Sequence, residues 1–275
     1  MKKMKAAYKR SAHRKNKQIT KSPPDHYTAM AQVHKIDNVF DDMDNLWAEI
    51  AQRHQTQQQT RFLKTQLKPN ERVLDAACGT GRHTIALYKE GFNVVGLDIS
   101  HKLLKIAKSQ GALLLVRGDL RALPFKSEIF SAIISVDNSF GYLASKDEDQ
   151  KSVFETRRVL QKGGRFLLDV FNRERLVYKY AGKQASARLF EYPSFQLEQV
   201  RAVSDNGEWL CDHWAITEYS GKKRVFSHKA HLYTFKELEE MLSKAEFVVD
   251  SVYGDYEKQP FKQDSKRLIV VSIAK

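Results

Sequence analysis

The sequence predicts an α/β fold, in which helices cover both faces of a doubly wound, mostly parallel β-sheet. Three observations support this prediction. Apolar runs of strand length alternate with helix-like segments between residues 72 and 171. Glycines follow several of the helix-like segments, as at Gly91 and Gly111. The strand-like runs are apolar almost throughout, which is typical of parallel strands buried on both faces.

The predicted elements begin with helices. Apolar residues fall at helical spacing from Val39 to Ile50, and a second helix covers residues 56–67 before Pro69 breaks the chain. The predicted strands that follow are 72–77, 93–98, 113–116, 130–136 and 165–171. The predicted helices between them are 82–90, 101–109 and 147–160. This alternation indicates repeated strand–helix–strand units and one parallel sheet.

The composition changes beyond residue 176. Residues 186–203, 208–219 and 224–233 are rich in aromatic and β-branched side chains, with turn residues between them, and predict an antiparallel meander of three strands. Thr234 and Glu237 have the spacing of a capping box, which predicts a helix over 235–245. Two further strands are expected at 247–253 and 267–274.

Charge divides the chain into two regions. The net charge is +13, but residues 1–24 carry nine Lys/Arg and no acid, whereas the remainder has 37 Lys/Arg against 33 Asp/Glu. We therefore expect a basic, disordered arm over 1–25 and a folded domain over 26–275, whose residues 26–69 are the N-terminal helices. Such an arm either contacts nucleic acid or an anionic surface, or is solvated without a specific role.

Cysteine content and hydropathy exclude several classes of protein. Cys78 and Cys211 are the two cysteines, which is too few for a disulfide framework or a four-cysteine zinc site. We expect no metal site and a cytoplasmic location. No apolar run approaches the ~20 residues that span a bilayer, so we expect no membrane contact.

The segment Val73–Gly81 is the central motif. It follows a predicted strand and opens a predicted helix, and its glycines allow a sharp turn close to a ligand. The N-terminus of the helix supplies free N–H donors for a phosphate or a carboxylate. The third glycine of a dinucleotide fingerprint is Thr84 here, and a P-loop lysine is absent.

Acidic residues end the first two predicted strands and follow the third. Asp75 can hold the glycine loop or a ligand amine, and Asp98 can accept both hydroxyls of a ribose. Asp119 can accept a hydrogen bond from the exocyclic amine of an adenine. Because parallel strands present their carboxyl ends at one edge of the sheet, these residues indicate a ligand that carries adenosine.

In these motifs the chain resembles the class I methyltransferases that depend on S-adenosylmethionine (SAM). The resemblance covers about residues 71–171 and includes Asp75–Gly81, Gly96–Ser100, Gly118–Leu120, Val136–Tyr142 and Leu160–Gly164. It implies a Rossmann-like sheet of seven strands with an antiparallel last strand. It also implies that the meander, over 183–233, is a substrate lid.

The resemblance further implies a set of SAM-binding residues. Ala77 and Gly79 would contact the methionine end, Asp98 the ribose, and Asp119 with Leu120 the adenine. The N-terminal helices resemble those of the glycine N-methyltransferase branch, which carry an aromatic residue and an arginine near SAM. The complete expected set is Asp75, Ala77, Gly79, Gly81, Asp98, Ile99, Asp119, Leu120, Asp137, Trp47 and Arg53.

The acceptor site is less defined by the sequence. Asp137 ends the fourth predicted strand and is the candidate catalytic residue, while Asn138, Tyr142 and, on the meander, His213 are candidate substrate contacts. The segment Asp137–Phe140 departs from the motif of enzymes that methylate exocyclic amines of DNA bases. We therefore expect SAM-dependent methylation of an N, O or C atom in a small molecule.

Three alternatives stay open at this point. An RNA methyltransferase could use the basic arm for phosphate contacts, although the domain itself carries little net charge. A binding module without catalysis could keep the same fold. A dinucleotide oxidoreductase is disfavoured by the missing third glycine.

Overall fold

The computed structural model describes residues 39–43, 45–183 and 187–275. The predicted basic arm, and the part of the predicted N-terminal helices before residue 39, lie outside the described residues. The described helices are α2 (Val39–Met43), α3 (Asn45–Ala51), α4 (Thr56–Gln66), α5 (Arg82–Lys89), α6 (His101–Ser109), α7 (Lys146–Val159), α8 (Arg173–Tyr180) and α9 (Phe235–Lys244). Within the described residues, no helix is long and apolar enough to cross a membrane.

Seven strands form the larger sheet, in the order β10-β11-β5-β4-β1-β2-β3. They are β1 (Arg72–Ala76), β2 (Asn93–Asp98), β3 (Leu115–Arg117), β4 (Phe130–Ser135), β5 (Leu160–Phe171), β10 (Phe247–Tyr253) and β11 (Arg267–Ala274). The pairs among β1 to β5 are parallel, and β11 runs antiparallel to both of its neighbours. The predicted seven-stranded sheet with an antiparallel last strand is confirmed.

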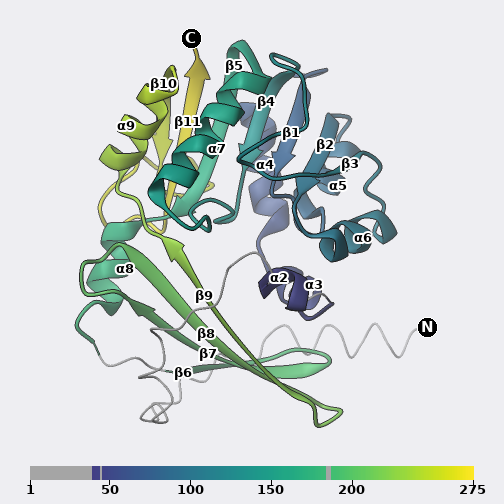
Figure 1. Ribbon diagram of the computed structural model, residues 1–275, viewed down its shortest axis with the longest axis vertical. Coiled ribbons are helices and arrows are strands. Elements are labelled where there is room, and N and C mark those ends of the chain that lie inside the picture. The colour runs from purple at the N-terminus through teal and green to yellow at the C-terminus, as the bar shows by residue number, and fades with distance from the viewer. Residues whose placement is uncertain (1–38, 44, 184–186) are drawn as a thin grey trace.

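Helices pack on both faces of this sheet, as Figure 1 shows. Leu63 of α4 and Leu87 of α5 belong to one apolar cluster, together with β1 and β4 residues such as Val73. Val153 of α7 and Leu238 of α9 belong to another cluster. The central strands are therefore buried on both sides, which explains why they lack alternation of polar and apolar residues.

A second sheet follows β5 and is antiparallel throughout. Its order is β6-β7-β8-β9, with the strands β6 (Ala187–Glu191), β7 (Phe195–Val203), β8 (Trp209–Glu218) and β9 (Lys223–His231). The prediction of three strands here was wrong, because the segment 186–203 contains two. The backbone N–H of Tyr192 donates to the carbonyl of Phe195, which closes a tight turn around Pro193 and Ser194 without a glycine.

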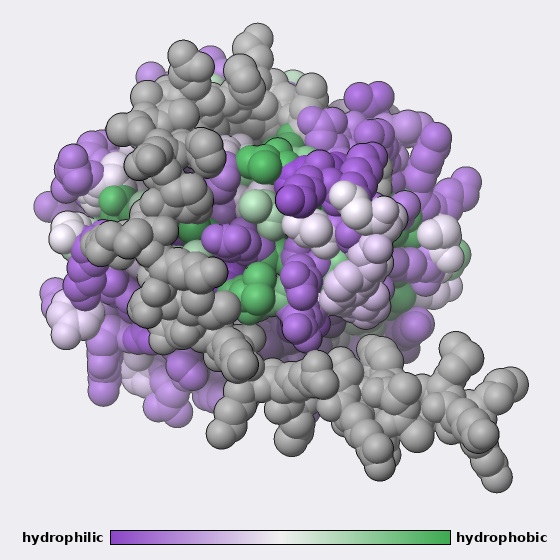
Figure 2. Space-filling model, turned by 90° about the horizontal axis from the view of Figure 1, so that it is seen from below, coloured by the Kyte–Doolittle hydropathy of each residue, from purple (hydrophilic) through white to green (hydrophobic). Residues whose placement is uncertain are grey.

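Burial along β8 alternates residue by residue, so one face of the small sheet packs inward and the other is partly exposed. Figure 2 shows the molecule from the side of this sheet, where polar side chains predominate and a few apolar ones lie between them. On the packed face, Met43, Leu46 and Ile50 of α2 and α3 meet Phe195 and Trp214. This contact fixes α2 and α3 between the two sheets.

Two helices after β5 connect the sheets. Helix α8 was not predicted from the sequence, and its Leu176 packs on Val203 and Leu210 of the small sheet. The predicted capping box at α9 is confirmed, because Thr234 and Glu237 exchange hydrogen bonds at its N-terminus.

Candidate active site

The glycine loop links the central strand β1 to α5. Ala77, Gly79 and Gly81 all have positive φ, at 60°, 55° and 74°. A Cβ on Gly81 would lie 2.9 Å from the Cβ of Ala107, so a side chain has no room at this position. Ala77 adopts a conformation that favours glycine, and such strain is common at binding loops.

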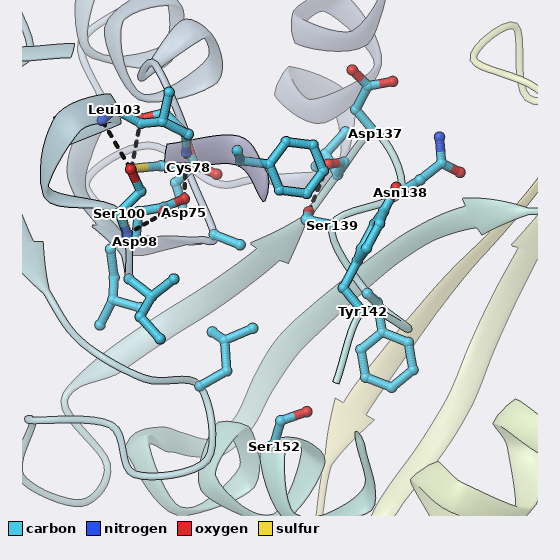
Figure 3. A pocket seen from close by; sticks show the side chains of 18 of the residues that line it. Asp75, Cys78, Asp98, Ser100, Leu103, Asp137, Asn138, Ser139, Tyr142 and Ser152 are labelled. Carbon is cyan, nitrogen blue, oxygen red and sulfur yellow. Dashed lines mark hydrogen bonds between the residues drawn. The ribbon is translucent and has the colours of Figure 1, made fainter. Parts of the chain in front are cut away.

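A cavity with room for about 200 Å³ of solvent opens beside this loop, at the carboxyl ends of β1, β2 and β4. The predicted residues that line it are Trp47, Asp75, Ala77, Gly79, Asp98, Ile99, Asp119, Leu120, Asp137, Asn138 and Tyr142. Figure 3 shows Asp75, Cys78 and Asp98 on one side of the cavity, and Asp137, Asn138 and Tyr142 on the other. The structure thus brings most of the predicted site into one space.

Asp98 fastens the glycine loop to β2. Its Oδ2 accepts a hydrogen bond from the Gly79 N–H at 2.7 Å, and its Oδ1 accepts one from the Ser100 N–H at 2.9 Å. The side chain is buried, and this burial raises the pKa of the carboxyl. Asp98 therefore joins the glycine loop to β2 at the cavity wall, and its contact with a ribose stays a prediction.

Asp75 lies deeper, within β1. Its Oδ2 accepts a hydrogen bond from the Thr84 hydroxyl at 2.6 Å, which ties β1 to α5. Burial raises the pKa of Asp75 from 3.8 to about 6. This residue holds the loop and the helix together beneath the cavity.

Asp119 is committed to an arginine. Arg121 donates to it through Nε and Nη2, with Nη2 at 2.6 Å from Oδ2, and through its backbone N–H at 2.8 Å from Oδ1. The hydrogen bonds from Arg121 lower the pKa of Asp119. Both carboxylate oxygens therefore accept hydrogen bonds within the protein, as those of Asp98 do, and the side chain stays 30% exposed.

Asp137 is the centre of a charged cluster in the loop after β4. Its Oδ2 accepts hydrogen bonds from Arg82 Nη2 at 2.6 Å and from His54 Nδ1, and its backbone N–H donates to Asp169 Oδ2 at 2.8 Å. Burial alone would raise the pKa of Asp137, but the hydrogen bond with His54 and the charge of Arg82 hold it well below its usual range.

This environment changes the role that the sequence suggested for Asp137. A carboxylate whose pKa is held low by a hydrogen bond with His54 and by the charge of Arg82 is a weak base, so Asp137 is poorly suited to take a proton from an acceptor. Asp137 and Asn138 both have φ of 65°, although neither is glycine. The cluster holds this loop in a strained conformation at the cavity wall.

Three predicted residues lie elsewhere. Arg53 stacks on the Tyr192 ring, with its Cζ 4.0 Å from the ring centroid, and does not line the cavity. His213 bonds the hydroxyl of Ser227 on the small sheet and also lies away from the cavity. Gly81 is part of the glycine loop and lies next to Ala107 of α6, but it does not line the cavity.

The position of His213 has a simple physical reason. Its neighbour Trp214 points to the packed face of the small sheet, where its ring stacks on that of Trp47 with the centroids 6.0 Å apart. Consecutive residues of a strand point to opposite faces, so His213 points away from the packed face.

Arg82 and His54 belong to the site although the sequence did not single them out. For Arg82 a signal was present, because a cation in the first turn of a helix opposes the helix dipole and calls for a compensating partner. Phe40 and Asp41 of α2 also line the cavity, and the Phe40 ring contacts those of Trp47 and Tyr142. Among the described residues, no group of side chains has the arrangement of a metal site.

This fold and this site define a SAM-dependent methyltransferase, and comparison with known proteins agrees. A family model described as "Methyltransferase domain" matches residues 73–164. Demethylmenaquinone methyltransferase of Renibacterium salmoninarum is 32% identical over 168 residues, which cover 55% of this chain and 69% of that protein. Glycine/sarcosine N-methyltransferase of Aphanothece halophytica is 38% identical over 119 residues, which cover 40% of this chain and 44% of that protein.

A solved structure shows the same architecture. The CcbJ methyltransferase from Streptomyces caelestis aligns with a TM-score of 0.75 and 19% identity, over 87% of this chain and 98% of that one. At this identity the likeness supports the fold alone. The family model and the relatives together show that the chain belongs to the class I SAM-dependent methyltransferases, with SAM as methyl donor. The non-catalytic and oxidoreductase alternatives are therefore set aside.

Proposed function

We propose that the protein transfers the methyl group of SAM to a small molecule, which binds between the loop after β4 and the small sheet. The observation that carries this proposal is the continuous cavity. Its wall includes the glycine loop and Asp98 on one side, and Asn138 and Tyr142 on the other. The two relatives named above have small-molecule substrates in their names, which favours the same class of acceptor here.

The residues present fit SAM. The loop at Gly79 leaves the backbone open to a ligand, since the atom nearest to a Cβ added at this position would be Trp47 Nε1, at 3.8 Å. Two buried acceptor atoms of the wall, Asn138 Oδ1 and Asp149 Oδ1, have no hydrogen-bond partner in the described part of the protein. We propose that Asp98 binds the ribose, that Ile99 and Leu120 pack on the adenine, and that Ala77, Gly79 and Trp47 surround the methionine end.

When bound, SAM supplies an electrophilic methyl group on a sulfonium that is already a good leaving group. The protein has to hold the acceptor in line with that methyl group and exclude water. We assign the first task to Asn138 and Tyr142. The Tyr142 ring contacts that of Phe40 of α2, which also lines the cavity, and that of His228 of β9, which supports Tyr142 from the small sheet.

This arrangement also supports a domain division. We propose that residues 26–275 form one methyltransferase domain and that the small sheet within 183–233 covers the acceptor. The basic segment 1–25 lies outside the described residues. Neither relative named above has a nucleic acid in its name, so the RNA methyltransferase alternative gains no support.

A labelling experiment tests the proposal. The protein is incubated with SAM carrying a radioactive methyl group and with either a low-mass metabolite fraction or total RNA. We expect label in the low-mass fraction, and we expect Asp98→Ala to abolish it, while Asp205→Ala, at an exposed turn, leaves it unchanged. Label in RNA alone would refute a small-molecule acceptor.

A further inference from the structure

Asp41, on the short helix α2, is an acidic residue of the cavity wall that the sequence did not single out. Its side chain is partly exposed, and its Oδ1 accepts a hydrogen bond from the Ser100 hydroxyl. Among the described residues, its Oδ2 has no hydrogen-bond partner. Asp41 therefore keeps one carboxylate oxygen for a donor that a ligand brings into the cavity.

Ser100 joins Asp41 to Asp98. The backbone N–H of Ser100 donates to Asp98 Oδ1 at 2.9 Å, while its hydroxyl donates to Asp41 Oδ1. The same hydroxyl accepts a hydrogen bond from the Leu103 N–H at 3.0 Å, which leaves its own proton for Asp41. Figure 3 shows Ser100 beside Asp98 on one side of the cavity. One residue thus holds two carboxylates close together at the cavity wall.

This arrangement of like charges is costly without a ligand. Burial raises the pKa of the Asp98 carboxyl, and the charge of Asp41 raises it further. Within the described part of the chain, neither Asp41 nor Asp98 forms an ion pair, whereas Asp119 pairs with Arg121. A ligand with hydroxyl groups that donate to both carboxylates would offset their repulsion.

We propose that Asp41 accepts a hydrogen bond from a ribose hydroxyl of SAM, and that it shares the ribose with Asp98. This inference rests on the cofactor position proposed above, in which Asp98 binds the ribose. The hydroxyl O–H donates and Asp41 Oδ2 accepts. A ribose has two adjacent hydroxyls, so it can donate to a carboxylate on each side.

The contact would also connect the cofactor to the acceptor wall. Helix α2 lies between α6 and the small sheet, as Figure 1 shows. Phe40 precedes Asp41 on this helix, and its ring contacts those of Trp47 and Tyr142, with centroids 4.9 and 5.4 Å away. A ribose bound to Asp41 therefore helps to hold Phe40 in place beside the acceptor.

Calorimetry with S-adenosylhomocysteine and with its 2′-deoxy and 3′-deoxy forms tests the contact. Each deoxy form lacks one ribose hydroxyl. We expect the unaltered protein to bind each deoxy form about tenfold or more weakly than S-adenosylhomocysteine, because a hydrogen bond to a charged acceptor is lost. In Asp41→Ala the penalty for one of the two hydroxyls should fall to about threefold or less, since its acceptor is gone.

Two further variants separate this contact from a structural role. Asp42→Ala is the matched control, because Asp42 is on the same helix but is exposed and does not line the cavity. Ser100→Ala removes the hydrogen bond to Asp41 but leaves its carboxylate. Both variants should keep both hydroxyl penalties, even if Ser100→Ala weakens the binding of all three probes.

Two outcomes would overturn the assignment. Asp41→Ala could weaken the three probes equally and keep both hydroxyl penalties, which would show that Asp41 only fastens α2 to Ser100. Asp42→Ala could lose a penalty as well, which would show that any charge on α2 has the same effect. If S-adenosylhomocysteine does not bind the unaltered protein, the proposed cofactor site itself is refuted.

Discussion

Arg82 Nη2 donates a hydrogen bond to Asp137 Oδ2 over 2.6 Å, although the two residues are 55 positions apart in the sequence. The contact joins the first turn of α5, directly after the glycine loop, to the loop after β4. Asp137 also connects to β5 through Asp169. The cofactor side and the acceptor side of the cavity are therefore held in a fixed relation by one ion pair.

Arg82→Met should destabilise the protein and weaken SAM binding. The side chains of Arg82 and Asp137 are only 16% and 18% exposed, so removal of the cation leaves a poorly solvated carboxylate. We expect a loss of about 3 kcal/mol in the free energy of unfolding, measured with urea. Arg82→Lys, which keeps the charge, should lose about half as much. Equal stability of Arg82→Met and the unaltered protein would show that the pair is unimportant.

Gly81→Ala should destabilise the protein more than Gly91→Ala. Both glycines have positive φ, at 74° and 88°, but an added Cβ meets Ala107 at 2.9 Å in the first case and open space in the second. We expect about 1 kcal/mol for the backbone strain at Gly91 and about 3 kcal/mol at Gly81, where overpacking is added. Chemical denaturation of the two variants measures the difference, and similar losses would contradict the close contact.

Asp75 should make stability fall as the pH rises from about 4 to about 6. Its pKa is raised from 3.8 to about 6, so the folded protein binds this proton more tightly than the unfolded chain does. Folding is then favoured below pH 4, and this advantage is lost as the pH rises through 6. A shift of about 2 units corresponds to ~3 kcal/mol.

Asp75→Asn isolates this effect. The amide can still accept the hydrogen bond from Thr84 but does not titrate. The free energy of unfolding of the variant, relative to that of the unaltered protein, should therefore rise by about 3 kcal/mol between pH 4 and pH 7. A constant difference across this range would show that Asp75 has an ordinary pKa in the folded state.

Substitutions of Trp47 and Arg53 should differ in their effect on the affinity for SAM. Trp47 lines the cavity beside Gly79, whereas Arg53 stacks on Tyr192 at the turn between β6 and β7. We expect Trp47→Leu to raise the Kd for SAM about tenfold, and Arg53→Ala to change it by about twofold at most. Calorimetric titration distinguishes them, and a large effect of Arg53→Ala would restore it as a cofactor contact.

The sequence predicts the larger sheet well, because each of its strands is a short apolar run that a glycine or a helix separates from the next. It predicts the small sheet less well. The turn at Pro193 and Ser194 lacks the Asn-Gly or Gly signal of tight hairpins, so β6 and β7 looked continuous. The helix α8 is short and highly charged, with Leu176 as its buried residue, and its apolar periodicity is correspondingly weak.

The candidate site also contains one part that the sequence predicts and one that it does not. Asp98 and the glycine loop are local motifs, and their places at strand ends can be read directly. The cluster of His54, Arg82 and Asp137 depends on contacts between distant segments, which a single sequence does not reveal. The contact between Asp119 and Arg121 is local, since the residues are two positions apart, but the motif alone does not show that the arginine side chain turns back to the carboxylate.

The small sheet is one continuous stretch of chain, entered after α8 and left before α9, and none of its strands pairs with the seven-stranded sheet. Exchanging this stretch for another would leave every parallel strand pairing and the glycine loop intact. Under the proposed function, the cover of the acceptor can therefore be exchanged as a unit, while the strand pairs and the glycine loop on the side of the methyl donor stay as they are. An engineer who wants a new acceptor would begin with Tyr142, which lines the cavity, and with His228 of β9, whose ring contacts it.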